Sequence, residues 1–531
     1  MRAPSLPPEQ AQRFQQLQIQ LRDRWQSIEQ FDQSDYDILV VPSVTLDQRE
    51  LRKIDGYLHY EERLLFSLIR LRNPKTRLIY VTSQPLPPIA IDYYLQLLPG
   101  IPFSHARERL LLFSTYDASL KPLTQKILER PRLLGRMRQA LRAGKSYMVC
   151  YNSTALERDL ALQLNIPLLA LDPNLLYWGT KSGSRQIFGE AGIPYPDGSE
   201  LVSTTDDLAM AAAELCQRQP EMKRLLVKLN EGFSGEGNAL MDLRSLPAGS
   251  LQTQAAAIHQ RFSQLSFQTD RETWENFSSQ IPELGAIVEA FIEGKEKRSP
   301  SVQGYITPDG EVTILSTHDQ ILGGPDGQVY LGCYFPADSA YRLQLQEMGL
   351  QVGQNLAEKG VIERFGVDFI ATRSIAPTGK VRWDLQAVEI NLRKGGTTHP
   401  FMTLKYLTNG YYDLDTGLFH SQEGTPKYYL ATDNLHHSCY AGLLPNDLMD
   451  IIAYHRLHFD SSTRTGTVFH LIGTLSEFGK VGLTSIGNSR EEAEAIYQEV
   501  KRVLNEETEE NSQQFPQNSR PSTPINWQGR G

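Results

Sequence analysis

The hydrophobic pattern of the chain changes at Trp178, and this change limits the folds that the chain can adopt. Before that residue, short apolar runs alternate with segments whose apolar residues recur every three or four positions. Such alternation is typical of parallel strands whose sheet is covered by helices. We therefore expect residues 1–177 to form an α/β domain with helices over Glu50–Arg72 and Leu120–Arg142. The expected strands are Tyr36–Val41, Arg77–Ser83, Arg109–Thr115 and Tyr147–Asn152.

After Trp178, a helical stretch over Gly179–Ala191 leads into a region where strand-like apolar segments follow one another closely. This density favours an antiparallel sheet with few helices, so we expect an α+β domain over residues 178–424. The expected strands are Leu225–Leu229, Ala286–Ile292, Val302–Ile306, Thr313–Leu315, Val329–Phe335, Phe365–Ala371 and Trp383–Leu392.

The end of the chain divides into two parts. Residues 425–505 contain a hairpin-like pair, Thr467–Leu475 and Gly482–Ile486, followed by an amphipathic helix over Ser489–Leu504. This pattern predicts a small C-terminal α+β domain. Residues 506–531 are rich in Glu, Gln, Asn, Ser and Pro, and such a segment cannot bury enough apolar surface to offset chain entropy. We expect it to be a disordered tail.

Charge and composition exclude some classes of partner. The 53 Lys and Arg residues are outnumbered by 62 Asp and Glu residues, a net charge of −9, so no basic field is available for a nucleic acid or an anionic membrane. No apolar run is long enough to span a bilayer, and the first thirty residues lack the apolar core of a signal peptide. The four cysteines are scattered without CxxC pairs. These features predict a cytoplasmic protein with free thiols.

A glycine-rich segment, Gly232–Gly237, lies between two apolar strands. Successive backbone N–H groups with little Cβ obstruction can close over phosphate oxygens, so Ser234, Gly235 and Gly237 are candidate phosphate contacts. Lys228, at the end of the preceding strand, is placed to reach the same oxygens. The pattern is equally typical of a surface hairpin with a flanking lysine.

The strand Val388–Arg393 carries the strongest local signal. Because side chains alternate along a strand, Glu389, Asn391 and Arg393 share one face while the apolar residues face the core. Mg²⁺ prefers oxygen ligands, and a carboxylate with an amide oxygen suits it. Asp368, in the preceding predicted strand, adds a further carboxylate across the sheet. A solvated strand with a Glu–Arg pair has the same alternation.

A helix start follows directly. Lys394–Pro400 contains two glycines, two threonines and a proline before an apolar helical pattern. The N–H groups of such a start, beside Arg393, form a site for a carboxylate or a developing oxyanion, which makes Gly396 a candidate contact. His399 is either a proton carrier or a structural histidine.

The segment Val288–Glu296 ends a strand in a turn with two carboxylates, Glu289 and Glu296. Backbone groups of an extended hinge can pair with a purine edge, and a carboxylate can accept hydrogen bonds from both ribose hydroxyls. A solvated acidic turn has the same composition.

In this order along the chain, the elements resemble the ATP-grasp superfamily over residues 178–410. They are Lys181 before Gly192-Ile193-Pro194, Lys228, the glycine-rich segment, Glu289 with Glu296, Asp368, and Glu389 with Asn391 and Arg393. Residues 1–177 would then be the domain that precedes the ATP-grasp fold in that superfamily. The glycine pair, the His-Pro sequence after Arg393 and the C-terminal module most resemble the pheganomycin-type peptide ligases.

The resemblance implies a role for each group of residues. Lys181 and Lys228 would bind ATP phosphates. The adenine hinge would be Glu289, Ala290 and Ile292, with Glu296 as the ribose carboxylate. The magnesium ligands would be Asp368, Glu389 and Asn391, and Arg393, with the Gly395 and Gly396 amides, would hold the acyl substrate. Glu236, within the glycine-rich segment, departs from the family pattern.

The activity that the resemblance implies is an ATP-dependent carboxylate–amine ligase that works through an acyl phosphate and releases ADP and phosphate. It implies ATP and Mg²⁺, or Mn²⁺ in its place, and a small-molecule acid and amine as substrates. Two alternatives stay open: a phosphotransferase on the same fold that gives a stable phosphorylated product, and a nucleotide-binding scaffold without turnover. The sequence leaves the oligomeric state open, a homodimer included.

Overall fold

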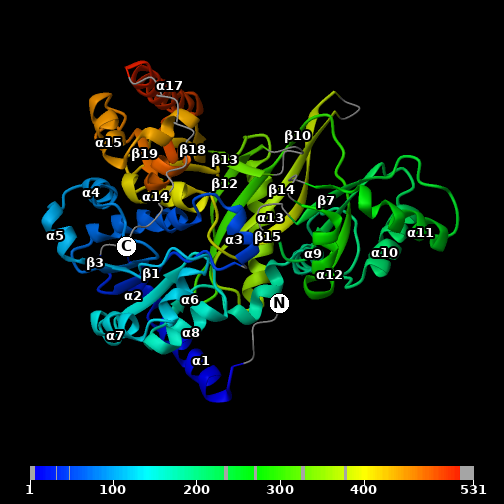
Figure 1. Ribbon diagram of the computed structural model, residues 1–531, viewed down its shortest axis with the longest axis horizontal. Helices are drawn as coiled ribbons and strands as arrows, with labels where there is room; N and C mark the ends of the chain where they lie inside the picture. The colour runs from blue at the N-terminus through cyan, green and yellow to red at the C-terminus, as the bar shows by residue number, and fades with distance from the viewer. Residues whose placement is uncertain are drawn as a thin grey trace, which may run out of the picture.

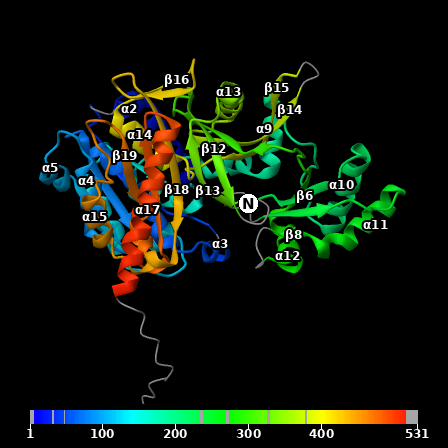
Figure 2. The same cartoon turned by 90° about the horizontal axis from the view of Figure 1, so that it is seen from above.

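The computed structural model describes residues 6–30, 33–46, 48–232, 237–267, 272–323, 329–375 and 379–514 (Figure 1). Three sheets organise these residues: one parallel sheet near the N-terminus, one small antiparallel sheet and one large antiparallel sheet. Figure 2 shows the parallel sheet and the C-terminal helices on one side, the large sheet in the middle, and the small sheet on the other side.

The N-terminal sheet has the strand order β3-β2-β1-β4-β5, with every pair parallel. Its strands are β1 (Asp37–Val41), β2 (Arg77–Thr82), β3 (Leu110–Ser114), β4 (Ser146–Cys150) and β5 (Leu168–Leu169). The first four confirm the predicted strands within one or two residues. Side chains alternate along β1, so that Leu39 and Val41 enter one apolar core while Ile38 and Val40 enter another. Both faces of the sheet are therefore buried.

Helices cover both faces of this sheet. Those that contribute to the first core are α1 (Pro8–Asp23), α6 (Leu123–Leu128), α7 (Pro131–Ala140) and α8 (Ala155–Leu164). Those that contribute to the second are α2 (Trp25–Glu29), α3 (Gln48–Lys53), η1 (Tyr57–Arg72), α4 (Pro88–Gln96) and α5 (Phe103–Glu108). The helix expected over 50–72 is interrupted at Gly56, whose φ of 71° breaks the run into α3 and the 3₁₀ helix η1.

The small sheet has the order β8-β7-β6-β9 and is antiparallel. Its strands are β6 (Arg224–Leu229), β7 (Asn238–Asp242), β8 (Ser266–Phe267) and β9 (Ala286–Ala290), and its helices are α10 (Thr205–Arg218), α11 (Leu251–Arg261) and α12 (Trp274–Leu284). These helices share one apolar core with the strands. The region therefore contains more helix than its strand pattern predicted. Thr204 begins α10 by accepting a hydrogen bond from the N–H of Asp207 at 3.1 Å, a local capping signal that the strand pattern does not contain.

The large sheet runs in the order β10-β14-β11-β12-β13-β18, and β15 pairs with β14. Its strands are β10 (Lys297–Arg298), β11 (Pro300–Ile306), β12 (Val312–Gly323), β13 (Val329–Phe335), β14 (Glu363–Ile375), β15 (Val381–Asn391), β16 (Tyr411–Asp413), β17 (Leu418–His420), β18 (Pro426–His436), β19 (Gly466–His470) and β20 (Lys480–Gly487). Helices α9 (Lys181–Ala191) and α13 (Arg342–Glu358) pack against it, and α14 (Thr398–Thr408) follows β15.

The C-terminal residues do not form a separate layer. β18 pairs with β13, β20 pairs with both β18 and β19, and the apolar core of these strands is continuous with that of η1 and α4. Two helices, α15 (Pro445–Tyr454) and α17 (Arg490–Gln514), lie beside this part of the sheet (Figure 1). Helix α17 continues nine residues past 505, where we expected a tail to begin, and residues 515–531 lie outside the described ranges.

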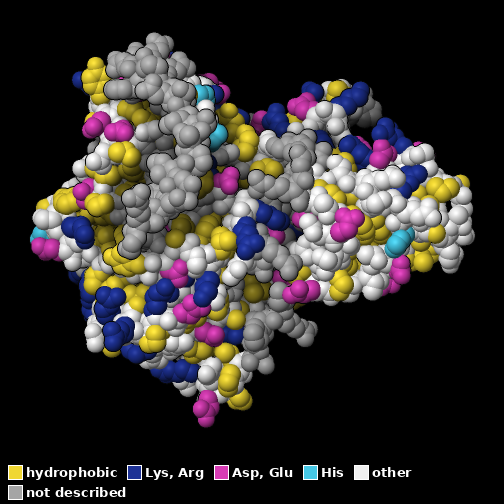
Figure 3. Space-filling model, in the orientation of Figure 1, with side chains coloured by type: hydrophobic (Ala, Val, Ile, Leu, Met, Phe, Trp, Pro, Cys, Tyr) yellow, Lys and Arg dark blue, Asp and Glu magenta, His cyan; other side chains and the backbone are white. Residues whose placement is uncertain are grey.

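The sequence also led to expectations about the cysteines, membrane-spanning helices and surface charge. All four cysteines are free thiols. Within the described ranges, no helix combines the length and apolar character that crossing a bilayer requires. On the face shown in Figure 3, Lys and Arg side chains lie among Asp and Glu side chains over most of the surface.

Candidate active site

A cleft of about 1280 Å³ is lined by residues from the small sheet, the large sheet and the N-terminal region. Eleven of the residues that the sequence singled out line it: Lys181, Lys228, Glu289, Ala290, Ile292, Asp368, Glu389, Asn391, Arg393, Gly395 and Gly396. Segments separated by more than two hundred residues along the chain therefore meet in one place.

Two carboxylates face each other at the centre of this cleft. Asp368 on β14 is the direct antiparallel partner of Glu389 on β15, and Gly366 is the partner of Asn391. The side-chain amide of Asn391 donates to Asp368 Oδ2 at 2.9 Å, and Gln320 on β12 donates to Asp368 Oδ1 at 2.6 Å. As the period-two pattern predicted, Glu389 and Asn391 reach the same cleft. These oxygen donors suit Mg²⁺. Val388 also lines it, in contrast to its predicted place in the core, because the register of β14 and β15 shifts beside it.

The pKa values of the two carboxyl groups move in opposite directions. Burial, and then the charge of Glu389, raise the pKa of Asp368 to about 6. Burial also disfavours the charged form of Glu389, but the charge and hydrogen bond of Lys181 outweigh it and lower the pKa of that group. The pair therefore consists of one carboxyl group whose pKa is lowered and one whose pKa is raised to about 6.

Lys181 supplies the cation beside Glu389. It is the first residue of α9, which Thr180 caps by accepting the N–H of Gly183 at 3.1 Å. The Lys181 backbone N–H donates to Asn230 O at 3.0 Å, and Nζ lies 2.5 Å from Glu389 Oε1. A buried ammonium that already pairs with this carboxylate shows that the pocket around Glu389 stabilises positive charge.

Lys228 lies in a second buried ion pair. Its Nζ contacts Glu289 Oε2, and Arg185 Nη1 lies 3.1 Å from Glu289 Oε1. Both oxygens of Glu289 are thus held by cations, and Arg185 was not singled out by the sequence. Glu289 reaches this position because β9 pairs with β6, which brings Glu289 opposite Leu226, two residues from Lys228.

The hinge after β9 lies between the two antiparallel sheets. Ala290 donates its N–H to Asp197 O at 2.8 Å, and Phe291 is stacked between Arg224 and Lys297, whose charged atoms lie 4.0 and 4.2 Å from the ring centre. Ala290 and Ile292 line the cleft, as a hinge along a ligand would.

Glu296 does not line this cleft, in contrast to its predicted role. Its carboxylate lies 3.2 Å from Arg373 Nη1 and 3.7 Å from Arg298 Nη2, and its carbonyl accepts the N–H of Arg373. The pairing of β10 with β14 draws this turn toward the distal end of β14. That long-range pairing has no signature in the local sequence.

The glycine-rich segment Gly232–Gly237 is only partly described. Ser234 and Gly235 lie outside the described residues. Gly237 accepts the N–H of Leu229 through its carbonyl at 2.8 Å and closes the β6–β7 connection against Gly232, but it does not line the cleft. Its predicted phosphate contact stays a prediction.

The segment after β15 places a glycine against an aromatic ring. Gly396 lines the cleft, and a Cβ at this position would lie 2.5 Å from Cε1 of Tyr330. The neighbouring Gly395 donates its N–H to Thr398 Oγ1 at 2.9 Å, so that donor is used to begin α14. Arg393 lines the same wall.

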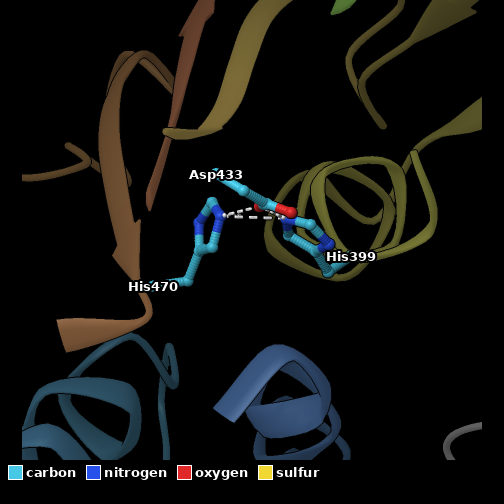
Figure 4. A group of neighbouring side chains, drawn as sticks. All are labelled: His399, Asp433 and His470. Atoms are coloured by element: carbon cyan, nitrogen blue, oxygen red, sulfur yellow. Dashed lines mark hydrogen bonds and ion pairs between the residues drawn. The ribbon is translucent and has the colours of Figure 1, made fainter. Parts of the chain in front are cut away.

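His399 does not line the cleft, a position that favours the structural one of its two predicted roles. It is 4% exposed, and it contacts His470 and Asp433. Burial lowers the pKa of His399 to about 4. From the first turn of α14, the His399 side chain points toward Asp433 on β18 and His470 at the end of β19 (Figure 4).

Several cleft residues were not predicted from the sequence. They come from η1, β12, β18, β20 and α17: Arg63, Gln320, Asp433, Lys480 and Arg490. Polar residues inside strongly apolar segments, such as Arg63 in η1, were the available signal, because a buried charge requires a partner.

Family models match most of the chain in two regions. A model described as "IQCH-like, ATP-grasp" matches residues 174–269 and 250–415. A second, described as "PGM1 C-terminal domain", matches residues 447–500. The first covers the small sheet and the large sheet as far as β16, and the second covers β19 and β20 with most of α15 and the first part of α17.

Known proteins resemble the chain over long stretches. It is 30% identical over 460 residues to the L-propargylglycine–L-glutamate ligase of Streptantibioticus cattleyicolor, an alignment that covers 84% of this chain and 90% of that protein. It is 25% identical over 378 residues to IQ motif-containing protein H of Danio rerio, covering 63% of this chain and 35% of that protein. Among solved structures, the ADP complex of N5-carboxyaminoimidazole ribonucleotide synthetase has a TM-score of 0.48 and 11% identity, covering 89% of this chain and 97% of that one.

Proposed function

The chain belongs to the ATP-grasp ligase family that includes the L-propargylglycine–L-glutamate ligase, and on that premise we propose that it is an ATP-dependent carboxylate–amine ligase. It joins a small-molecule acid and a small-molecule amine through an amide bond and releases ADP and phosphate. The observation that carries the proposal is the meeting of Asp368, Glu389 and Asn391 with Lys181 and Lys228 in one cleft.

The chemistry follows from the low reactivity of carboxylates toward amines. A carboxylate oxygen of the acid attacks the γ-phosphorus of ATP, the bond to ADP breaks, and an acyl phosphate forms. The amine nitrogen then attacks the acyl carbon, the carbon–oxygen bond to phosphate breaks, and the amine loses a proton. Both steps depend on positioning and on neutralising charge, which a cleft lined by fixed cations provides.

The cations divide between two walls of the cleft. Lys181 on α9 and Lys228 on β6 bind the nucleotide phosphates and exchange their present carboxylate partners, Glu389 and Glu289, for phosphate oxygens. The acyl end is held by Arg393, with the N–H of Gly396 beside it. The N–H of Gly395 does not contribute, because it bonds to Thr398.

The residues that would hold Mg²⁺ are Asp368, Glu389 and Asn391. Their donor set fits the ion, because all three offer oxygen atoms and two are carboxylates. When bound there, Mg²⁺ or Mn²⁺ would neutralise charge on the phosphate groups. Gln320 holds Asp368 Oδ1, and so orients this carboxylate.

The test is a screen of paired acids and amines with ATP, in which ADP, free phosphate and product mass are measured together. A ligase gives phosphate equal to ADP and a product whose mass is that of acid plus amine minus water. Phosphate retained on the acid after complete reaction would instead identify a phosphotransferase. ATP binding without ADP formation across broad substrate pools would identify a scaffold.

Two variants on β15 distinguish loss of the metal site from loss of folding. Glu389→Gln removes the negative charge of a proposed metal ligand and is expected to abolish turnover. Asp384→Asn, on the same strand, removes a carboxylate that pairs with Arg382 at 2.8 Å at the exposed end and is expected to retain turnover. Unimpaired ligation by Glu389→Gln would refute the metal assignment.

A further inference from the structure

Three side chains beneath the cleft converge on one point (Figure 4). His399 comes from the first turn of α14, Asp433 from β18 and His470 from the end of β19. The Nε2 atoms of the two histidines lie 2.9 Å apart, and Asp433 Oδ1 lies 3.0 Å from Nε2 of His399 and 2.6 Å from Nε2 of His470. All three residues are buried. Their three potential ligand atoms form a closed triangle.

Protons alone cannot satisfy this triangle. Asp433 is an ionised acceptor, because the Arg63 guanidinium pairs with its Oδ2 atom. If only His470 carries a proton on Nε2, the contact of 3.0 Å between His399 and Asp433 sets two lone pairs against each other. If both histidines carry one, two N–H groups oppose each other at 2.9 Å. Each arrangement leaves at least one contact repulsive, whereas a cation at the centre makes all three attractive.

We propose that His399, Asp433 and His470 bind a divalent transition-metal ion, and that this ion is Zn²⁺. Two imidazole nitrogens and one carboxylate oxygen form a donor set typical of zinc, whereas Mg²⁺ prefers oxygen alone. Ligand atoms about 2.0 Å from a tetrahedral zinc ion lie about 3.3 Å apart. The observed contacts of 2.6 to 3.0 Å therefore need to open by about 0.3 to 0.7 Å to reach the separation in a tetrahedral site.

The surroundings hold two of these ligands in place. Arg63 bonds to the carboxylate oxygen of Asp433 that points away from the triangle, which fixes the orientation of the group as an outer partner of a metal ligand does. Beside His470, a Cβ on residue 482 would lie 2.2 Å from Nε2, so the glycine at this position leaves room for the ring.

This site is separate from the proposed Mg²⁺ site on β14 and β15. It joins α14, β18 and β19, and Asp433 alone of its three ligands lines the cleft. The ion would therefore lie under the cleft floor and fix the C-terminal strands to the helix that follows Arg393. Zn²⁺ binding at this site is independent of the reaction that the cleft performs.

Metal content tests the proposal directly. Tag-free protein is stripped with a chelator, dialysed against Zn²⁺, passed through a desalting column and analysed by mass spectrometry of its metals. A single retained equivalent per chain is expected. The same protein loaded with Co²⁺ is expected to show the intense visible absorption of a four- or five-coordinate nitrogen–oxygen site, a readout that needs no variant.

Matched variants assign the ligands. His399→Gln and His470→Gln are expected to lose the retained Zn²⁺ and the Co²⁺ absorption. His455→Gln, which alters a histidine paired with Glu507 at 2.6 Å, and Glu389→Gln, in the proposed Mg²⁺ site, are expected to keep both. Folded wild-type protein that retains no Zn²⁺ and gives no Co²⁺ absorption would overturn the proposal. Equal metal content in His470→Gln and wild type would also overturn it.

Discussion

Asp368 and Glu389 are direct partners across β14 and β15, yet their pKa values shift in opposite directions. The difference arises from Lys181, which pairs with Glu389 at 2.5 Å and leaves Asp368 to neutral donors. One carboxylate is thus ionised throughout the physiological range, while the other takes up a proton close to it. A cation that enters this site competes with that proton.

The first prediction concerns this competition. Binding of Mg²⁺ with ADP is expected to weaken as the pH falls through about 6, because the raised pKa of Asp368 leaves the group protonated below that value and a protonated carboxyl is a poor metal ligand. Isothermal titration calorimetry between about pH 5 and about pH 8 measures it. Affinity that stays constant across this range contradicts the assignment of Asp368.

A control isolates the contribution of the protein, because nucleotide phosphates also titrate in this range. In Asp368→Asn the affinity is expected to be lower at every pH and to keep only the slope that the nucleotide itself causes. In Glu389→Gln the loss of a neighbouring charge lowers the pKa of Asp368, so the remaining transition is expected to move to lower pH.

The second prediction concerns Lys228. Lys228→Met is expected to raise the KM for ATP by about 10- to 100-fold, because one charge-assisted contact to phosphate contributes about 1.5–3 kcal/mol. The KM values for the acid and the amine are expected to change little. The control is Arg244→Gln, which removes an exposed ion pair with Asp242 just after β7 in the same sheet. A larger effect on the acid than on ATP would reassign this lysine.

The third prediction compares two adjacent glycines. Gly396→Ala is expected to reduce turnover and to lower the free energy of unfolding by about 1–3 kcal/mol, because the added Cβ would lie 2.5 Å from the Tyr330 ring. Gly395→Ala is the matched control, since its Cβ meets nothing within 4 Å. Denaturant unfolding and steady-state rates measure both variants.

The close approach of Gly396 to Tyr330 also makes a rescue testable. Adding Tyr330→Leu to Gly396→Ala removes the ring that the new Cβ meets, and part of the lost stability is expected to return. Equal losses in the two alanine variants would show that backbone freedom, rather than contact with Tyr330, explains the glycine pair.

The fourth prediction concerns Glu61 in η1. Its carboxylate accepts the N–H and the hydroxyl of Ser83, but burial raises its pKa to about 7. In the unfolded chain the pKa of this group is near 4.5. Between pH 4.5 and about pH 7 the folded state therefore binds more protons than the unfolded state, and the free energy of unfolding falls as the pH rises. The loss amounts to at most about 3 kcal/mol and is complete above about pH 7.

Glu61→Gln removes this titration. The free energy of unfolding of the variant is expected to fall less than that of wild type between about pH 5 and about pH 8. Denaturant unfolding of both proteins at the two pH values measures the two changes in unfolding free energy. Subtracting one change from the other cancels the contribution of the other titrating groups. A parallel decline in both proteins would show that Glu61 is already ionised in the folded state.

Local periodicity was sufficient for many individual elements. The alternation over Val388–Arg393 predicted a strand with Glu389 and Asn391 on one face, and β15 has that geometry. The four N-terminal strands were also predictable, because an apolar run between helical patterns is a property of adjacent residues. The order of the motif residues along the chain identified the family.

The contacts that complete the site depend on which distant segments pair, and neighbouring residues do not encode this. Glu289 meets Lys228 because β9 pairs with β6, while Glu296 leaves the cleft because β10 pairs with β14. His399 contacts Asp433 on β18 and His470 on β19, and these two strands belong to the large sheet through the pairing of β13 with β18 and of β20 with β18 and β19. Such pairings depend on how apolar faces from the whole chain are buried together. A local pattern therefore predicts which side chains of a strand share a face, but not which distant segment packs against that face.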